Sequence, residues 1–257
     1  MKCILFLALT CIIVVNAQEF SPTIEDNSFF IEEAYNQEEH VVQHIFTINS
    51  SHGINLFETS FTQEWPAFSQ THQLSFTLPF QFSIPKTITS NGIGDLLLNY
   101  RYQLVNENEL AIAPRVSIIL PTGDEAKGFG NAVVGMQFNL SVSKRFSNEI
   151  VTHYNAGLTA FPNVQFTTSK ATITEYFFGA SGIYLANKHF NTMVEILYTS
   201  SGSKFERTNE LIISPGVRWA IDIGDLQIVP GMAFPFNYNS NPQNVGLLFY
   251  FSFEHSY

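Results

Sequence analysis

The last thirteen residues of the chain, VGLLFYFSFEHSY, alternate between two kinds of side chain. Counting back by twos from Tyr257 gives an aromatic and apolar face, while the residues between them form a more polar face that includes Ser252 and Glu254. Successive residues of a strand point to opposite faces, so this stretch predicts a strand with one apolar side. Transmembrane β-barrel strands have this character. Strands of a soluble β-sandwich share it, so the rest of the chain has to decide.

The same alternation recurs along the chain. In residues 132–143, Phe138 and the residues at two-residue steps from it are apolar, whereas Asn139 and the residues at two-residue steps from it are mostly polar or small. Residues 74–84 and 95–104 show a similar alternation. Further segments begin near Val41, Ile54, Leu110, Glu149, Tyr176, Phe190, Glu210 and Leu226. With the last strand they make about twelve segments, each roughly as long as a tilted membrane strand of 9–11 residues. The prediction is an all-β fold: a transmembrane antiparallel up-and-down β-barrel of about 12 strands.

Composition agrees with this prediction. The chain is 45% hydrophobic and only 13% charged, which is a low charge content for a water-soluble domain. After the N-terminal apolar stretch, no apolar run approaches the roughly 20 residues of a membrane helix. The net charge of −10 and the scatter of the 12 basic residues argue against nucleic acid as a partner, because phosphates require clustered Lys and Arg.

The N-terminus predicts export. Residues 1–17 combine Lys2, an apolar run and a small residue at Ala17, which is typical of a cleaved signal peptide. Both cysteines, Cys3 and Cys11, lie inside it, and a lipid anchor at Cys11 is the alternative interpretation. The acidic residues 18–40 form either a periplasmic tail, an extra strand or a small plug, and residues 41–257 form the barrel. An exported chain without further cysteine indicates a bacterial envelope protein located in the outer membrane.

Connection lengths predict the orientation of the barrel. Long connections at 121–130, 162–174, 199–209 and 237–244 alternate with short ones at 105–109, 145–148, 186–189 and 221–225. Outer-membrane barrels have short periplasmic turns and longer external loops. The pattern therefore predicts an even number of strands with both ends of the barrel in the periplasm.

Three stretches resemble a known family. They are SFFIEEAYNQEEHVVQHI (28–45), GIGDLLLNYRYQL (92–104) and APRVSIILPTGDEAKGFGNAVVGMQFNLSVSKRF (113–146). They are similar to the bacterial outer-membrane protein family labelled "MetA-pathway of phenol degradation". The Gly-Asp entry to a strand, the arginine-centred strand and the Pro-Thr-Gly-Asp loop carry the resemblance. The resemblance implies a single barrel that passes small hydrophobic or aromatic compounds across the outer membrane.

Several charged residues fall on the inward register of the predicted strands. Charges in a narrow lumen are costly unless they are paired or hydrated. One interpretation is a network of salt bridges that fixes the barrel shape. The other is a constriction in which Arg101, Arg115 and Arg218 attract anionic or aromatic permeants, since guanidinium groups pair with carboxylates and stack on rings. The inward charged residues are Asp95, Arg101, Arg115, Glu195, Arg218 and Glu254.

The loop 121–130 contains Asp124, Phe129 and three glycines. It is either a mobile external gate or an ordinary hairpin with Gly at turn positions. His40 and His44 lie four residues apart beside acidic residues, but no third partner is evident, so no metal site and no cofactor are predicted.

Catalysis is not expected from this sequence. His153 faces inward on its predicted strand, and no neighbouring Ser is placed by the sequence to work with it. No G-x-S-x-G, H-E-x-x-H or phosphate-binding glycine loop occurs.

The predicted function is passage of small, hydrophobic or aromatic molecules through a monomeric outer-membrane barrel. The alternative is a structural or surface-interaction barrel with a closed lumen and partner-binding external loops. The expected partners are outer-membrane lipid and lipopolysaccharide, a small hydrophobic solute, and the barrel-assembly machinery, which would recognise the strand ending at Tyr257.

Overall fold

The computed structural model describes residues 28–50, 56–83, 91–166, 169–238 and 244–257. The predicted signal peptide, 1–17, and residues 18–27 of the predicted N-terminal segment lie outside the described residues.

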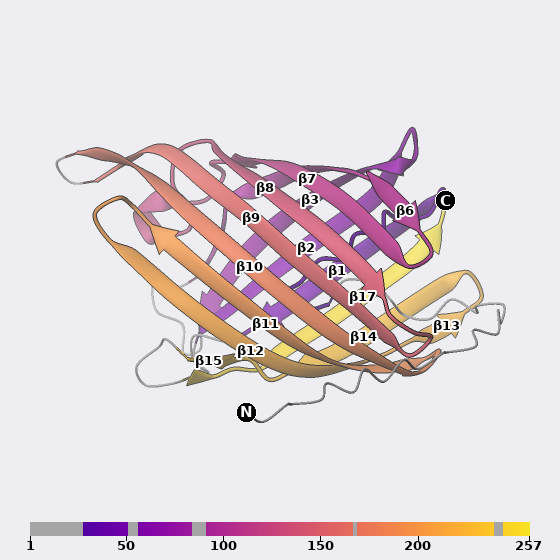
Figure 1. Cartoon of the computed structure of the whole chain (residues 1–257). Helices are drawn as coiled ribbons and strands as arrows, with labels where there is room; N and C mark the ends of the chain where they lie inside the picture. The colour runs from indigo at the N-terminus through magenta and orange to yellow at the C-terminus, as the bar shows by residue number, and fades with distance from the viewer. Residues whose placement is uncertain (1–27, 51–55, 84–90, 167–168, 239–243) are drawn as a thin grey trace, which may run out of the picture.

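The described residues form a closed barrel of 12 long antiparallel strands (Figure 1), which confirms the predicted fold. Some of these strands are interrupted and count as more than one segment. Strand β17 pairs with β1, with Ser256 opposite Val41 and Leu248 opposite Asn49, and this pairing closes the sheet. Closure leaves no open edge in the barrel wall. The segments are β1 (Val41–Asn49), β2 (Leu56–Ala67), β3 (Ser69–Ser83), β4 (Gly92–Ile93), β5 (Leu96–Tyr102), β6 (Val105–Glu107), β7 (Leu110–Leu120), β8 (Gly135–Arg145), β9 (Ile150–Gln165), β10 (Lys170–Asn187), β11 (Phe190–Gly202), β12 (Arg207–Trp219), β13 (Ile221–Ile223), β14 (Leu226–Ala233), β15 (Phe236–Asn237), β16 (Asn244–Val245) and β17 (Leu248–Ser256).

The side chains along each strand point alternately outward and into the barrel, as the period-two pattern predicts. Phe138 in β8 and Phe251 in β17 point outward and are 46% and 42% exposed, while the adjacent Asn139 and Ser252 point into the barrel and are 1% exposed. The outer surface is an apolar band in which large side chains such as Met136 stand exposed. Such a band, facing outward on every strand, is the surface that a barrel presents to lipid.

The two ends of the barrel differ, and we call them the turn end and the loop end. The turn end holds the C-terminus and tight connections, and there the Tyr257 N–H donates to the His40 carbonyl at 2.9 Å. The loop end holds the 121–134 connection with η1 (Glu125–Lys127), the only helix among the described residues. No described helix has the length and apolar character needed to cross a membrane.

Two of the predicted long loops are mostly strand. Strand β9 continues to Gln165 and β10 begins at Lys170, while β11 runs to Gly202 and β12 begins at Arg207. The ranges 162–174 and 199–209 therefore contain tall hairpins with short tips. Beyond the apolar band both faces of a strand can be polar, so the alternation fades although the backbone pairing continues.

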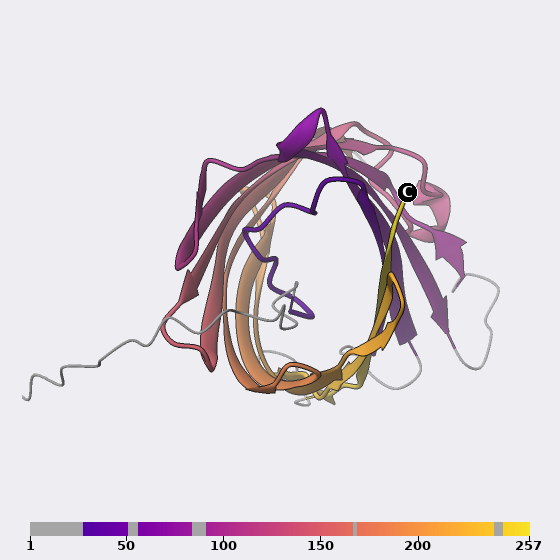
Figure 2. The same cartoon turned by 90° about the vertical axis from the view of Figure 1, so that its right-hand side faces the viewer.

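The lumen contains part of the chain itself. Figure 2 looks along the barrel from the turn end and shows the indigo trace of residues 28–40 running inside the ring of strands. Beside it, on the wall formed by β9 to β14, a cluster of buried apolar side chains projects into the lumen. The cluster includes Val151, Ile183, Met193 and Val229 of the wall, together with Phe29 of the segment inside the lumen.

Candidate functional site

Residues 28–37, which we call the lumen segment, are held largely through their backbone. The N–H groups of Phe30 and Ile31 both donate to Glu195 Oε1, at 2.8 and 3.1 Å. Inward-facing side chains therefore take the place of a neighbouring strand and satisfy the amides of an otherwise irregular segment. The same pattern continues with Glu32 N–H to Asn155, Ala34 N–H to Ser143, Asn36 N–H to Gln103 and Gln37 N–H to Gln73, at 2.7 to 2.8 Å.

Side chains of the barrel also donate to carbonyl groups of the lumen segment. Gln103 Nε2 donates to the Ala34 carbonyl at 2.6 Å, and Asn155 Nδ2 donates to the Glu32 carbonyl at 2.9 Å. Arg101 directs its guanidinium at the carbonyls of Glu33 and Tyr35 and at the Asn36 side chain. Arg101 is 3% exposed, and these hydrogen bonds hold the lumen segment against the barrel wall.

Glycines in the wall make room for the side chains of the lumen segment. The ring of Phe29 occupies the space that side chains at Gly216 and Gly231 would need, and it stands edge-on to Tyr250 with ring centroids 5.6 Å apart. Ile31 occupies the corresponding space at Gly179. Close packing of this kind fixes the depth of the segment in the lumen.

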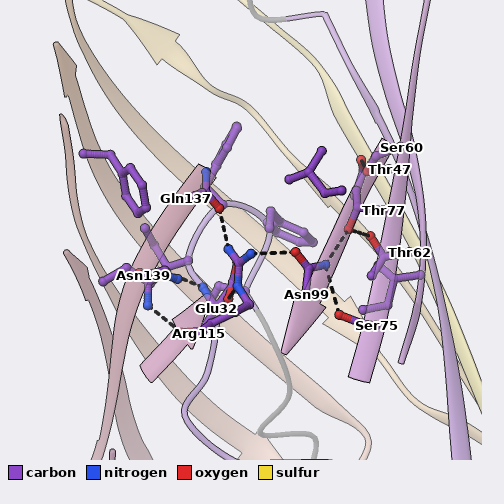
Figure 3. Close-up of a pocket in the computed structure, with 18 of the residues that line it drawn as sticks. Glu32, Thr47, Ser60, Thr62, Ser75, Thr77, Asn99, Arg115, Gln137 and Asn139 are labelled. Atoms are coloured by element: carbon purple, nitrogen blue, oxygen red, sulfur yellow. Dashed lines mark hydrogen bonds and ion pairs between the residues drawn. The ribbon is translucent and has the colours of Figure 1, made fainter. Parts of the chain in front are cut away.

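Arg115 and Glu32 form an ion pair in the middle of the lumen (Figure 3). Arg115 Nη2 lies 2.6 Å from Glu32 Oε1, and Nε lies 3.0 Å from Oε2, so the contact is bidentate. A bidentate, charge-assisted contact is stronger and more directional than a single hydrogen bond. It ties the lumen segment to β7.

The charge state of Glu32 follows from its surroundings. Burial opposes ionisation of this carboxyl, but the Arg115 and Arg101 guanidinium groups and the hydrogen bonds to it outweigh burial and hold the pKa of Glu32 below its usual range. Glu32 is therefore ionised at neutral pH, and the ion pair is present.

A cavity of about 370 Å³ lies against the lumen segment. Most of the strand residues that line it lie in the loop-end halves of the strands, and residues 28–32 of the lumen segment line it as well. One wall is apolar, with Phe177 on β10, Leu197 on β11, Tyr250 on β17 and Ile45 on β1, while Leu97 lies on the other side, on β5 opposite Thr77. The opposite wall is made of hydroxyl and amide side chains, several of which are labelled in Figure 3: Thr47, Ser60, Thr62, Ser75, Thr77, Asn99, Gln137 and Asn139.

The sequence left two interpretations of the inward arginines open, a network of salt bridges and a constriction, and the structure gives each arginine its own partners. Arg101 and Arg115 bind the lumen segment, and Arg218 is 0% exposed within the barrel, where its Nε donates to Asn191 Oδ1 at 3.4 Å. Glu195 is 1% exposed and holds the backbone of the lumen segment. The lumen segment therefore supplies acceptors to two of the three arginines, Arg101 and Arg115.

Asp95 and the loop 121–130 belong together. Asp95 points inward at the loop end, where Oδ1 accepts from the Gly123 N–H at 2.9 Å and Oδ2 from the Asn131 N–H at 3.0 Å. Asp95 therefore fastens the loop to the barrel. Phe129 is 6% exposed and packs over Gly92, while Asp124 is exposed and paired with Lys127, which lowers the pKa of Asp124 mainly through a hydrogen bond. These contacts describe a fastened hairpin.

The structure changes the interpretation of one histidine, His153, and places another, His44, on the outer surface. His153 does have a serine beside it: Ser143 Oγ lies 2.7 Å from His153 Nδ1. Both residues are 0% exposed, and Ser143 also accepts from Ala34 N–H, so the pair is a packed part of the lumen. His44 stacks on Phe253 and His255 on the outer surface, and the described residues contain no group of three or more potential metal ligands.

Sequence reasoning missed the polar partners of the lumen segment. Gln73, Gln103 and Asn155 were on the inward register, but nothing in the sequence distinguishes an amide that binds peptide from one that faces water. Glu32 lay within the acidic stretch 18–40 and carried no strand pattern. The one available signal was the presence of inward arginines, Arg101 and Arg115, together with the acidic stretch 18–40, because opposite charges would be expected to pair.

The barrel has the fold of outer-membrane channels. The sequence matches no protein-family model and no curated protein sequence. Among solved structures, the chain is similar to the COG4313 outer membrane channel from Pseudomonas putida F1, with a TM-score of 0.64, 12% identity, and coverage of 87% of this chain and 98% of that chain. It is also similar to the NanC porin, with a TM-score of 0.59, 8% identity and coverage of 84% and 100%, and to the KdgM porin, with a TM-score of 0.51, 10% identity and coverage of 84% and 99%. At these identities the likeness concerns the fold.

Proposed function

We propose that the protein is an outer-membrane channel for small solutes, in which the lumen segment forms a displaceable plug. The main observation behind the proposal is the cavity of about 370 Å³ inside a closed barrel, which is lined in part by residues 28–32 of the lumen segment. The size suits a small molecule, and a pocket with an apolar wall and a few placed polar groups is typical of small-molecule sites. The fold shared with porins and with an outer-membrane channel supports the location and the transport class.

The apolar wall favours a solute with a hydrophobic or aromatic body. Phe177, Leu197 and Tyr250 offer surface that contributes about 25 cal/mol for each Å² of apolar area removed from water. The resemblance to the "MetA-pathway of phenol degradation" family points to the same solute class.

A closed barrel with a structural role is the second candidate. The buried contacts of the lumen segment favour it, because they fill the lumen below the cavity. The two candidates differ in whether the segment moves.

A disulfide lock tests the proposal. Ala34 and Ser143 are in contact, with Ala34 N and Ser143 Oγ 2.8 Å apart, so cysteines at both positions would join the segment to β8. In planar bilayers we expect little current when the pair is oxidised and a larger current after reduction. A single Ala34→Cys variant controls for the reductant. Current that is absent before and after reduction would favour the structural barrel.

A further inference from the structure

The cavity has little capacity to bind an anion. Among the described lysines and arginines, Arg115 alone lines it. A guanidinium has five N–H donors, and Arg115 directs two at Glu32 and one each at Asn99, Ser117 and Gln137. None is left for a solute.

The neutral groups of the polar wall also bond to one another. Thr47 pairs with Ser60 at 2.7 Å, and Thr62 pairs with Thr77 at 2.9 Å. Gln137 Nε2 donates to Thr159 Oγ1 at 2.9 Å. The donors of this wall are therefore largely satisfied within the protein.

Acceptors are in surplus in the same cavity. Glu64 and Glu175 line it, and each carboxyl group has two oxygens that can accept hydrogen bonds. Glu64 Oε2 accepts from Gln73 Nε2 at 2.8 Å, and no described lysine or arginine forms an ion pair with Glu175. Asn139, which is 1% exposed and also lines the cavity, has an Oδ1 that accepts no hydrogen bond from the described residues.

The pairing register places carboxylates beside the apolar wall. Across β10, β11 and β12, Phe177 lies opposite Thr199, and Thr199 lies opposite Glu210. Glu175 is the next inward residue of β10 toward the loop end, and it lines the same cavity. A carboxyl group therefore stands at the loop-end border of the apolar patch, where it can accept hydrogen bonds from a cationic donor.

We propose that the cavity binds a small organic cation, with an ammonium group toward Glu175 and an apolar body against Phe177 and Leu197. The inference rests on the proposed function and specifies its solute class. The aromatic rings of Phe177 and Tyr250 add a face that attracts cations. This charge preference is opposite to that of an arginine-lined constriction.

Three probes that share an aromatic ring and differ in charge test the proposal: benzylammonium is a cation, benzyl alcohol is neutral and benzoate is an anion. Calorimetry on the full-length folded protein in detergent should show binding of benzylammonium that is several times tighter than binding of either other probe. In planar bilayers with a gradient of benzylammonium chloride, the reversal potential should favour the organic cation over chloride. Equal binding of the three probes, or a reversal potential that favours chloride, would overturn the cation proposal.

Two variants test the residues. Glu64→Gln with Glu175→Gln should remove most of the preference for benzylammonium, and Glu175→Gln alone should weaken it in a protein with a less altered lumen. Glu109→Gln, at the exposed turn end, should bind like the parent. Parent-like preference in both lumen variants would contradict the assignment. If no salt gives a current, the channel function fails, while calorimetry still decides whether the cavity prefers a cation.

Discussion

Ile31 of the lumen segment occupies the space in which a side chain at Gly179 would stand. The absence of a Cβ on β10 is thus what lets the segment lie against the wall. The barrel and the lumen segment fit one another at a position where the sequence shows only a glycine within an alternating strand.

Gly179→Val should displace the middle of the lumen segment, because a branched side chain there meets Ile31 and overpacking of a filled site is unfavourable by about 1–3 kcal/mol. The measurement is maleimide labelling of a cysteine at Ala34, which is 0% exposed in the parent. Labelling should become faster in the Gly179→Val background. The matched control is Gly182→Val on the same strand, where a Cβ would meet nothing within 4 Å. Equal labelling rates in the two backgrounds would mean that Gly179 does not seat the segment.

Arg115→Ala should loosen the docking of the lumen segment by about 1.5–3 kcal/mol, the range for hydrogen bonds to charged groups. The expected result is a higher open probability in single-channel recordings, with the barrel still folded by heat-modified gel mobility. Lys144→Ala is the control, since it removes an ion pair with Glu109 that lies outside the lumen, at a distance of 3.2 Å. An Arg115→Ala channel as closed as the control would show that the pair does not hold the plug.

Acid should release the segment as well. The pKa of Glu32 is lowered in the folded protein by Arg115 and Arg101 despite burial. A carboxyl with a depressed pKa contributes stability that is present above its unfolded pKa of about 4.3 and is lost as pH falls through the folded value. We therefore expect labelling at Ala34 to be constant from neutral pH down to that range and to accelerate below it. In Glu32→Gln this acceleration should be absent; if it persists unchanged, other groups govern the response.

The sequence predicted the wall of the barrel well and its contents poorly. Which side chains of β8 point outward could be predicted from polarity. Phe138 is apolar, as a surface in contact with lipid requires, and Asn139 is polar, as is common inside a barrel. The lumen segment could not be predicted, because it is bound through backbone groups, which every residue carries, and through sites such as Gly179 that are defined by empty space. Arg101 and Arg115 were correctly placed on the inward register, but their partners Asn36 and Glu32 come from a segment without periodicity.

Two other departures have similar causes. Asp95 fastens the loop 121–131 by accepting backbone N–H groups, and such acceptance leaves no trace in the sequence of the loop. The strands β9 to β12 extend beyond the apolar band, where both faces meet water, so their ends looked like loops.

Phe138→Arg should destabilise the barrel in lipid by roughly 2–4 kcal/mol if it lies near the bilayer midplane, because a cation would face hydrocarbon. A suitable comparison is Thr199→Arg, which introduces the same side chain into the cavity beside Glu210. Denaturant unfolding in lipid vesicles should show a much smaller loss for Thr199→Arg. Equal losses would contradict the assignment of the outer surface to lipid.

The loop end should face the cell exterior, with the turn end in the periplasm. Phe205 lies at the tip of the β11–β12 hairpin and is 75% exposed, whereas Asn148 lies in the turn between β8 and β9 at the other end. Short turns in the periplasm and taller hairpins outside are the arrangement of outer-membrane barrels. On intact cells an impermeant maleimide should therefore label Phe205→Cys and leave Asn148→Cys unlabelled, while both should react after the outer membrane is permeabilised. Labelling of Asn148→Cys alone on intact cells would reverse the orientation, and the loop end would then face the periplasm.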